Sequence, residues 1–169
     1  MADDLSGDVQ QEATQPVKSA TIDPRGPRFG AGITTLVLAG ALLAIPSDES
    51  SSVTLAAVLL GFQALVFGAA TFGGMRAQFY GLIYRALVAP RLAPPAERED
   101  PAPPRFAQLV GFIFVVVALI GLAFGSLVVA QIATGLALAA SFLNAVFGFC
   151  LGCEIYLLLR RMRGGAAAA

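Results

Sequence analysis

The sequence contains no histidine and no tryptophan among its 169 residues, and it has two cysteines. Without histidine, the chain cannot form haem sites with histidine ligands, mixed cysteine–histidine zinc sites or catalytic triads with an imidazole base. Charged residues are also scarce, at 13% of the chain, whereas a soluble domain has about a quarter. The eleven basic and eleven acidic residues balance, so no excess of positive charge indicates nucleic acid as a partner.

Apolar residues are abundant: they make up 57% of the sequence, and the mean hydropathy is +0.76. They are concentrated in four uncharged runs at about residues 29–45, 53–72, 106–124 and 127–149. A bilayer core about 30 Å thick is crossed by about 20 helical residues. We therefore predict an all-α polytopic membrane protein with four transmembrane helices in a lipid bilayer. A soluble helical bundle is disfavoured because such runs leave no polar faces to cover it.

Positive charge is distributed asymmetrically around these runs. Basic residues precede the first run, occur between the second and third runs, and follow the fourth, whereas the two short turns contain none. The positive-inside rule then places both termini and the central segment in the cytoplasm. We predict a multi-pass protein of the cytoplasmic (inner) membrane with cytoplasmic N and C termini.

The chain divides into a membrane domain flanked by two tails. Residues 1–21 are polar and acidic, which predicts a disordered tail without the features of a cleaved secretory signal. The membrane domain spans residues 22–163, and a proline-rich linker at 90–99 separates its two halves. Residues 164–169 are predicted to be a flexible tail.

The two halves, residues 22–89 and 100–163, are predicted to be copies of one helical hairpin. Both begin with the motif Asp-Pro-x-x-Pro-Arg-Phe, and Val66-Phe67-Gly68 recurs as Val146-Phe147-Gly148. Because both hairpins enter the membrane from the same side, the repeat is parallel, with a pseudo-two-fold axis along the membrane normal. Each copy then continues into an amphipathic segment, predicted to be an interfacial helix.

The repeated motif is predicted to position the helices, in preference to binding a substrate. Proline can begin a helix, aspartate can cap it, and arginine can anchor in the headgroup layer. The motif residues are Asp23, Pro24, Pro27, Arg28 and Phe29 in the first copy and Asp100, Pro101, Pro104, Arg105 and Phe106 in the second.

The fourth run has a stripe of polar side chains within about 140° of the helix circumference, at about 100° per residue. This stripe indicates either a pathway towards the cysteines or hydrogen bonds between helices. The second interpretation is favoured because the stripe contains no charged residue. Its members are Gln131, Thr134, Ser141 and Asn144.

The two cysteines are Cys150 and Cys153, at the end of the fourth run. A Cys-x-x-Cys pair on a helix is within disulfide range, and a helix that begins after Gly148 would favour the Cys150 thiolate. A permanent structural disulfide is not expected on the reducing cytoplasmic side. We predict exchange of electrons or of sulfane sulfur, in which Cys150 attacks, Cys153 resolves and Glu154 transfers the proton.

Other interpretations of the cysteines remain open. The pair could hold a metal across a homodimer or be small apolar filler, and Glu154 could be an interfacial carboxylate paired with an arginine. No cofactor is predicted. The protein could instead transport a small sulfur compound or act as a non-catalytic anchor or assembly subunit, so the sequence does not decide whether it is an enzyme.

The Asp-Pro-x-x-Pro-Arg-Phe motif and the stretch Phe-Cys-Leu-Gly-Cys-Glu-Ile-Tyr resemble an uncharacterised, mainly actinobacterial membrane family, known as a domain of unknown function. The resemblance covers residues 22–162 and implies a four-span protein. The resemblance also implies that genes of this family often lie beside genes for thioredoxin-like proteins and thiosulfate sulfurtransferases. A soluble partner of either kind is therefore expected. No catalytic residue is established in the family, so the roles given to the cysteines depend on their chemistry.

Overall fold

The computed structural model describes residues 21–47, 52–95 and 97–166, with side chains up to residue 163. The tail predicted at 1–21 lies outside these ranges except for its last residue. The tail predicted at 164–169 begins within a helix, and its last three residues lie outside the described part.

Four long apolar helices confirm the prediction of an all-α protein able to cross a membrane four times. Their boundaries lie within a few residues of the apolar runs. They are α2 (Arg25–Ala44), α3 (Thr54–Phe72), α5 (Ala102–Ala123) and α6 (Leu127–Phe147).

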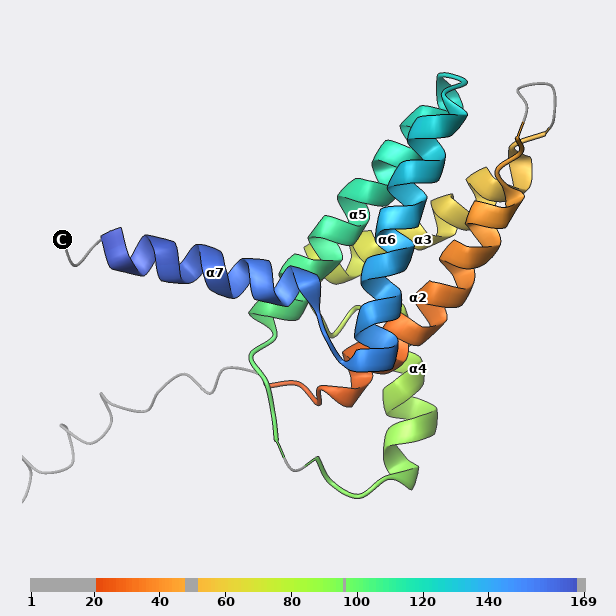
Figure 1. The fold of residues 1–169 in the computed structure, drawn as a ribbon. Coiled ribbons are helices and arrows are strands. Elements are labelled where there is room, and N and C mark those ends of the chain that lie inside the picture. The colour runs from red at the N-terminus through yellow and green to blue at the C-terminus, as the bar shows by residue number, and fades with distance from the viewer. Residues whose placement is uncertain (1–20, 48–51, 96, 167–169) are drawn as a thin grey trace, which may run out of the picture.

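These helices form an antiparallel bundle in which α2 packs against α3 and α6, and α5 packs against the same two helices. The end of α2, the start of α3 and the α5–α6 turn lie at one end of the bundle, and the remaining described segments gather at the other (Figure 1). The core contains Leu38, Leu60 and Val115, all fully buried, together with alanines that allow close helix approach.

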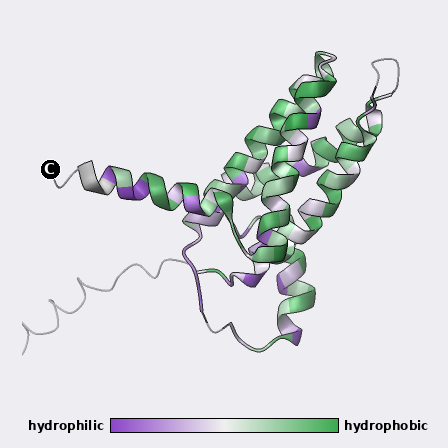
Figure 2. Ribbon diagram, viewed as in Figure 1, coloured by the Kyte–Doolittle hydropathy of each residue, from purple (hydrophilic) through white to green (hydrophobic). Residues whose placement is uncertain are grey.

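The outer surface of the bundle is apolar (Figure 2). Leu36, Leu43 and Leu65 are 75%, 87% and 75% exposed, and large apolar side chains point outward from all four helices. Soluble proteins rarely expose such continuous apolar surface, so the bundle requires lipid around it. This confirms the prediction of a membrane protein.

Two shorter helical segments follow the hairpins. The first begins with α4 (Phe79–Ile83), continues as π-helix η2 (Tyr84–Val88) and ends in the 3-10 turn η3 (Ala89–Arg91). The second is α7 (Leu151–Ala166), which contacts α5 near its start and then extends away from the bundle (Figure 1).

An unpartnered apolar stripe runs along α7. Its members fall within about 100° of the helix circumference at about 100° per residue, and all are exposed. Such a helix fits the surface of a bilayer. The stripe consists of Leu151, Ile155, Leu158, Leu159 and Met162.

Both copies of the repeated motif form the first turn of a helix, so α2 and α5 begin before Phe29 and Phe106. Pro24 and Pro101 adopt right-handed helical angles, since proline has no amide hydrogen to leave unpaired there. Asp23 and Asp100 each accept, through Oδ1, the backbone N–H two residues ahead, at 2.9 Å in both cases.

The motif arginines have a role that the sequence did not reveal. Arg28 donates to the carbonyls of Ala145 and Val146 at 3.1 and 2.9 Å, and Arg105 donates to the carbonyl of Thr71 at 2.7 Å. These carbonyls lie in the last turns of α6 and α3, where they lack partners within the helix. Each arginine therefore caps the second helix of the other copy, whereas the sequence predicted an anchor in the headgroups.

Reciprocal contacts relate the two copies. Ile22 and Glu99, which directly precede the two motifs, exchange both backbone hydrogen bonds at 3.0 Å. A two-fold axis between equivalent residues produces such an exchange. The capped carbonyls precede Phe72-Gly73 and Phe147-Gly148, so these helix ends correspond. Phe67-Gly68, which the sequence comparison paired with Phe147-Gly148, lies inside α3 instead.

Candidate thiol site

The chain reverses at Gly148, which directs the cysteines back towards the bundle. Gly148 has φ 69° and ψ 14°, a left-handed conformation that glycine adopts without strain. Its N–H donates to the carbonyl of Asn144 at 3.1 Å, and the N–H of Phe149 donates to the carbonyl of Leu143 at 3.3 Å. These bonds close α6 and leave Cys150 as the last residue before α7.

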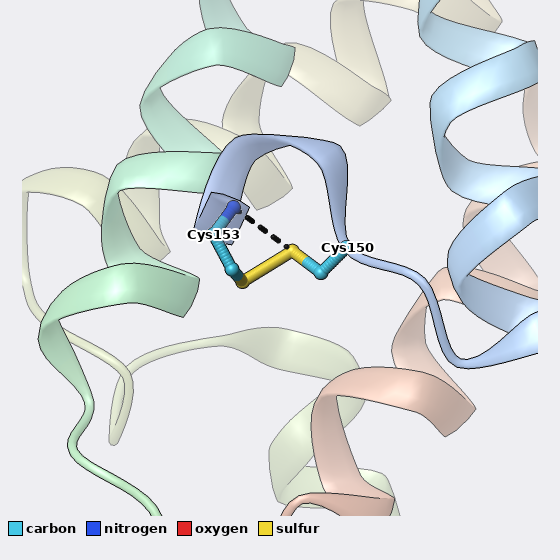
Figure 3. The surroundings of a disulfide bond; sticks show 2 residues. All are labelled: Cys150 and Cys153. Atoms are coloured by element: carbon cyan, nitrogen blue, oxygen red, sulfur yellow. Dashed lines mark hydrogen bonds between the residues drawn. A yellow bond between two sulfur atoms is a disulfide. The ribbon is translucent and has the colours of Figure 1, made fainter. Parts of the chain in front are cut away.

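Cys150 and Cys153 are joined by a disulfide, and their Cα atoms are 5.2 Å apart (Figure 3). The backbone N–H of Cys153 donates to Sγ of Cys150 at 3.3 Å, and that of Glu154 donates to the Cys150 carbonyl at 3.1 Å. Sγ of Cys150 therefore occupies the place of an N-capping oxygen. Both cysteine side chains are half-buried.

This position determines what the pair can do chemically. Once the disulfide is reduced, the amide of Cys153 and the positive end of the α7 dipole stabilise negative charge on Cys150. A stabilised thiolate is the nucleophilic form of cysteine. Cys153, already within bonding distance, can then attack any mixed disulfide formed at Cys150.

The remaining predicted site residue, Glu154, lies in the first turn of α7 with an exposed side chain. Among the described side chains it forms neither a hydrogen bond to a sulfur nor the ion pair with arginine that the sequence left open. The described residues also contain no cluster of three or more potential metal ligands within this chain.

The first copy has a counterpart of this site without sulfur. Gln78 directly precedes α4 as Cys150 precedes α7. In both copies a tyrosine six residues further on packs on the motif phenylalanine: the ring centroids of Phe29 and Tyr84 are 5.7 Å apart, as are those of Phe106 and Tyr156. Cys150 and Cys153 therefore stand where the first copy has Gln78 and Gly81.

The two copies also differ at the second residue of the helix that follows each hairpin. Tyr80 is buried and donates to Gln63 Oε1 at 2.9 Å, and the Gln63 amide donates to Thr34 at 3.3 Å. Burial raises the pKa of Tyr80 to about 12, so its hydroxyl remains a donor. The equivalent residue in the second copy is Gly152, which lies directly against the backbone of Ala107.

A cavity of about 280 Å³ lies beside the disulfide, between α2, α3, α5, α6 and the start of α7. Of the predicted polar stripe, Ser141 and Asn144 line this cavity, whereas Thr134 is fully buried and Gln131 lies nearer the other end of α6. Thr35 also donates to Ser141 at 3.2 Å, which is a hydrogen bond between helices.

Besides Thr34 on α2, sequence reasoning missed a second polar residue of the cavity, Gln108 on α5. It is the one polar side chain in the apolar run at 106–124, and that isolation was the available signal.

A larger cleft of about 740 Å³ lies on the side of the first copy and includes neither cysteine. On its wall, Asp23 pairs with Arg25 at 3.0 Å and accepts a hydrogen bond from Tyr84 at 3.1 Å. The Arg25 guanidinium lowers the pKa of the Asp23 carboxyl below its usual value, and burial raises that of Tyr84. The cleft is also lined by four arginines: Arg76, Arg85, Arg98 and Arg105.

A family model described as Domain of unknown function (DUF4395) matches residues 22–161, which confirms the resemblance to a family of unknown function. No curated protein and no solved structure matches the chain.

Proposed function

Because the chain belongs to the DUF4395 family, which has no assigned activity, we propose a function from the site: thiol–disulfide exchange at the membrane. The Cys150–Cys153 pair accepts two electrons from a soluble thioredoxin-like dithiol, or returns them. The observation that supports this most is the hydrogen bond from the Cys153 amide to Sγ of Cys150, because such a bond favours the thiolate, and hence the nucleophilic form, of Cys150 in the reduced pair.

The exchange requires two successive displacements. A thiolate of the partner attacks one sulfur of the disulfide, forming a mixed disulfide and releasing the other cysteine as a thiolate. The second thiol of the partner then attacks the mixed disulfide. The partner leaves as a disulfide, and its two electrons and two protons remain on Cys150 and Cys153. In the reverse direction, the Cys150 thiolate attacks the partner's disulfide first.

The surroundings of the cysteine pair favour a location at the cytoplasmic side of an inner membrane. The partner would then be a cytoplasmic protein. The cysteines share their end of the bundle with the central segment and with Arg160, Arg161 and Arg163 of α7. Such arginine-rich ends are retained on the cytoplasmic side. The apolar stripe of α7 would keep the site at the bilayer surface, within reach of a soluble protein.

A trapping experiment in cells tests the proposal. In Cys153→Ser, the resolving sulfur is absent, so the mixed disulfide between Cys150 and its partner accumulates. We expect non-reducing electrophoresis and mass spectrometry to show a covalent complex with a thioredoxin-like protein. Cys150→Ser is the matched control and should trap at least tenfold less.

Different products would separate the alternatives. A persulfide on Cys150, without a mixed disulfide, would indicate sulfur transfer from a sulfurtransferase-like partner. Free thiols in both variants under every growth condition would contradict the proposal and leave the transport and anchor interpretations.

A further inference from the structure

The cavity beside the disulfide corresponds to a place that a side chain occupies in the first copy. There, Tyr80 points into the bundle and reaches Gln63 on α3. In the second copy the equivalent residue, Gly152, packs against the backbone of Ala107, and a cavity of about 280 Å³ lies beside it, next to Cys150. The tyrosine side chain that packs into the bundle in the first copy therefore has no counterpart in the second, where a cavity lies next to the cysteine.

The lining of the cavity determines what kind of molecule it accepts. Phe67, Phe114 and the alanines of α6 supply apolar surface, and the polar groups are neutral amides and hydroxyls. None of the described residues that line the cavity is charged. A sulfur oxyanion or a charged peptide would lose its hydration there without a compensating charge, so the lining selects an uncharged, largely apolar molecule.

The cavity also extends to membrane depth. It reaches Leu136 on α6, and the distance from there to the helix end at Phe147 is about 16 Å at 1.5 Å per residue. Cys150, which follows the end of α6, lines the same cavity. A molecule dissolved in the bilayer could therefore fill the cavity and contact the sulfur.

One buried polar atom of the lining indicates hydrogen bonding to that molecule. Gln108 Oε1 is buried, and no hydrogen-bond partner for it is found within the described part of the chain. Buried polar atoms normally have a partner, because an unpaired one costs about 1–3 kcal/mol. An amide can accept a hydroxyl hydrogen through its oxygen and donate to a carbonyl through its nitrogen.

We propose that this cavity binds a lipid-soluble quinone, which oxidises the reduced Cys150–Cys153 pair. The proposal depends on the exchange function above, since the soluble dithiol supplies the electrons. The two thiols lose two electrons and two protons and form the disulfide bond. The quinone gains both and leaves as a hydroquinone, so atoms and charges balance. Gln108 can donate to the quinone carbonyl and accept from the hydroquinone hydroxyl.

The test uses the full-length protein, reduced and placed in lipid nanodiscs without oxygen. Decylubiquinone is the probe, because its fully substituted ring does not arylate thiols. Thiol loss is measured by mass-tag labelling and quinone reduction by ultraviolet absorbance. We expect stoichiometric disulfide and hydroquinone in the wild type.

Two variants and one matched control locate the reaction. Ala140→Phe fills the cavity from α6 and is expected to slow oxidation by decylubiquinone at least tenfold. Gln108→Leu keeps the volume and should raise the quinone concentration needed for half-maximal rate about tenfold. Ala139→Phe adds the same ring on the exposed side of α6 and should react like the wild type. Disulfide formation with the chemical oxidant diamide checks that each variant is folded.

The outcomes distinguish this proposal from the one on which it depends. A wild-type pair that exchanges with reduced thioredoxin but is not oxidised by decylubiquinone would overturn the quinone site and keep the exchange function. The same conclusion would follow if Ala140→Phe reacted as fast as Ala139→Phe. A pair that does not exchange with thioredoxin would contradict the exchange function itself.

Discussion

At the scale of single residues, the two cysteines are chemically unequal because of where α7 begins. Cys150 precedes the helix and accepts an amide hydrogen, whereas Cys153 lies within the first turn. The sequence predicted this order of roles from Gly148 and the spacing. It could not show that Gln78 and Gly81 hold the equivalent places, because that correspondence depends on how α4 and α7 pack against α2 and α5.

Asp23 supports a pH prediction. Its pKa is lowered mainly by the hydrogen bond from Arg25, so the folded state binds this proton less readily than the unfolded state. The stabilisation is therefore present above the usual aspartate pKa of about 3.9 and is lost as the pH falls through the lowered value. We expect Asp23→Asn to reduce the free energy of unfolding by about 1 kcal/mol at pH 7, and by less in acid.

Thermal unfolding in detergent at several pH values measures this difference. Asp100→Asn is the matched control, because the bond from Ala102 is its one described side-chain interaction, without an ion pair or a tyrosine. A destabilisation by Asp23→Asn that grew in acid would contradict the assignment.

At the scale of elements, sequence patterns located the helices but not their contacts. Hydropathy placed the four spans within a few residues, because any helix crossing a bilayer must be apolar along its length. The predicted starts of α2 and α5 lay a few residues after the observed ones, because the prolines of the motif form part of the first helical turn. The hydrogen bonds of Arg28 and Arg105 join residues more than thirty positions apart, which no local pattern encodes.

Removal of a capping arginine should loosen the helix that it caps. Arg28→Ala is expected to cost about 1.5–3 kcal/mol, since hydrogen bonds from a charged group are lost at the end of α6. Hydrogen exchange should accelerate in the segment around Ala145–Cys150, next to the disulfide, and not at the end of α3.

Arg105→Ala provides the reciprocal comparison and should accelerate exchange at the end of α3 instead. Arg163→Ala, on the exposed part of α7, should change neither segment. If Arg28→Ala loosened α3 and left α6 unchanged, the cross-copy capping would be wrong.

At the scale of the whole molecule, the two hairpins share one framework and differ at the thiol site. Equivalent helix starts, caps and aromatic contacts give both copies one framework, and the Gln78–Gly81 place receives a cysteine pair in the second. The paired cysteines were visible in the sequence. The cavity was not visible, since residues from five helices, α2, α3, α5, α6 and α7, line it together.

The most direct test asks whether the pair reacts, and from which side of the membrane. Reduced thioredoxin, which does not cross a bilayer, is added to right-side-out and to inside-out membrane vesicles that contain the oxidised protein. Mass-tag labelling then measures the fraction of Cys150–Cys153 disulfide that has been reduced. The account predicts reduction in the inside-out vesicles alone. Reduction only in right-side-out vesicles, or in neither preparation, would contradict it.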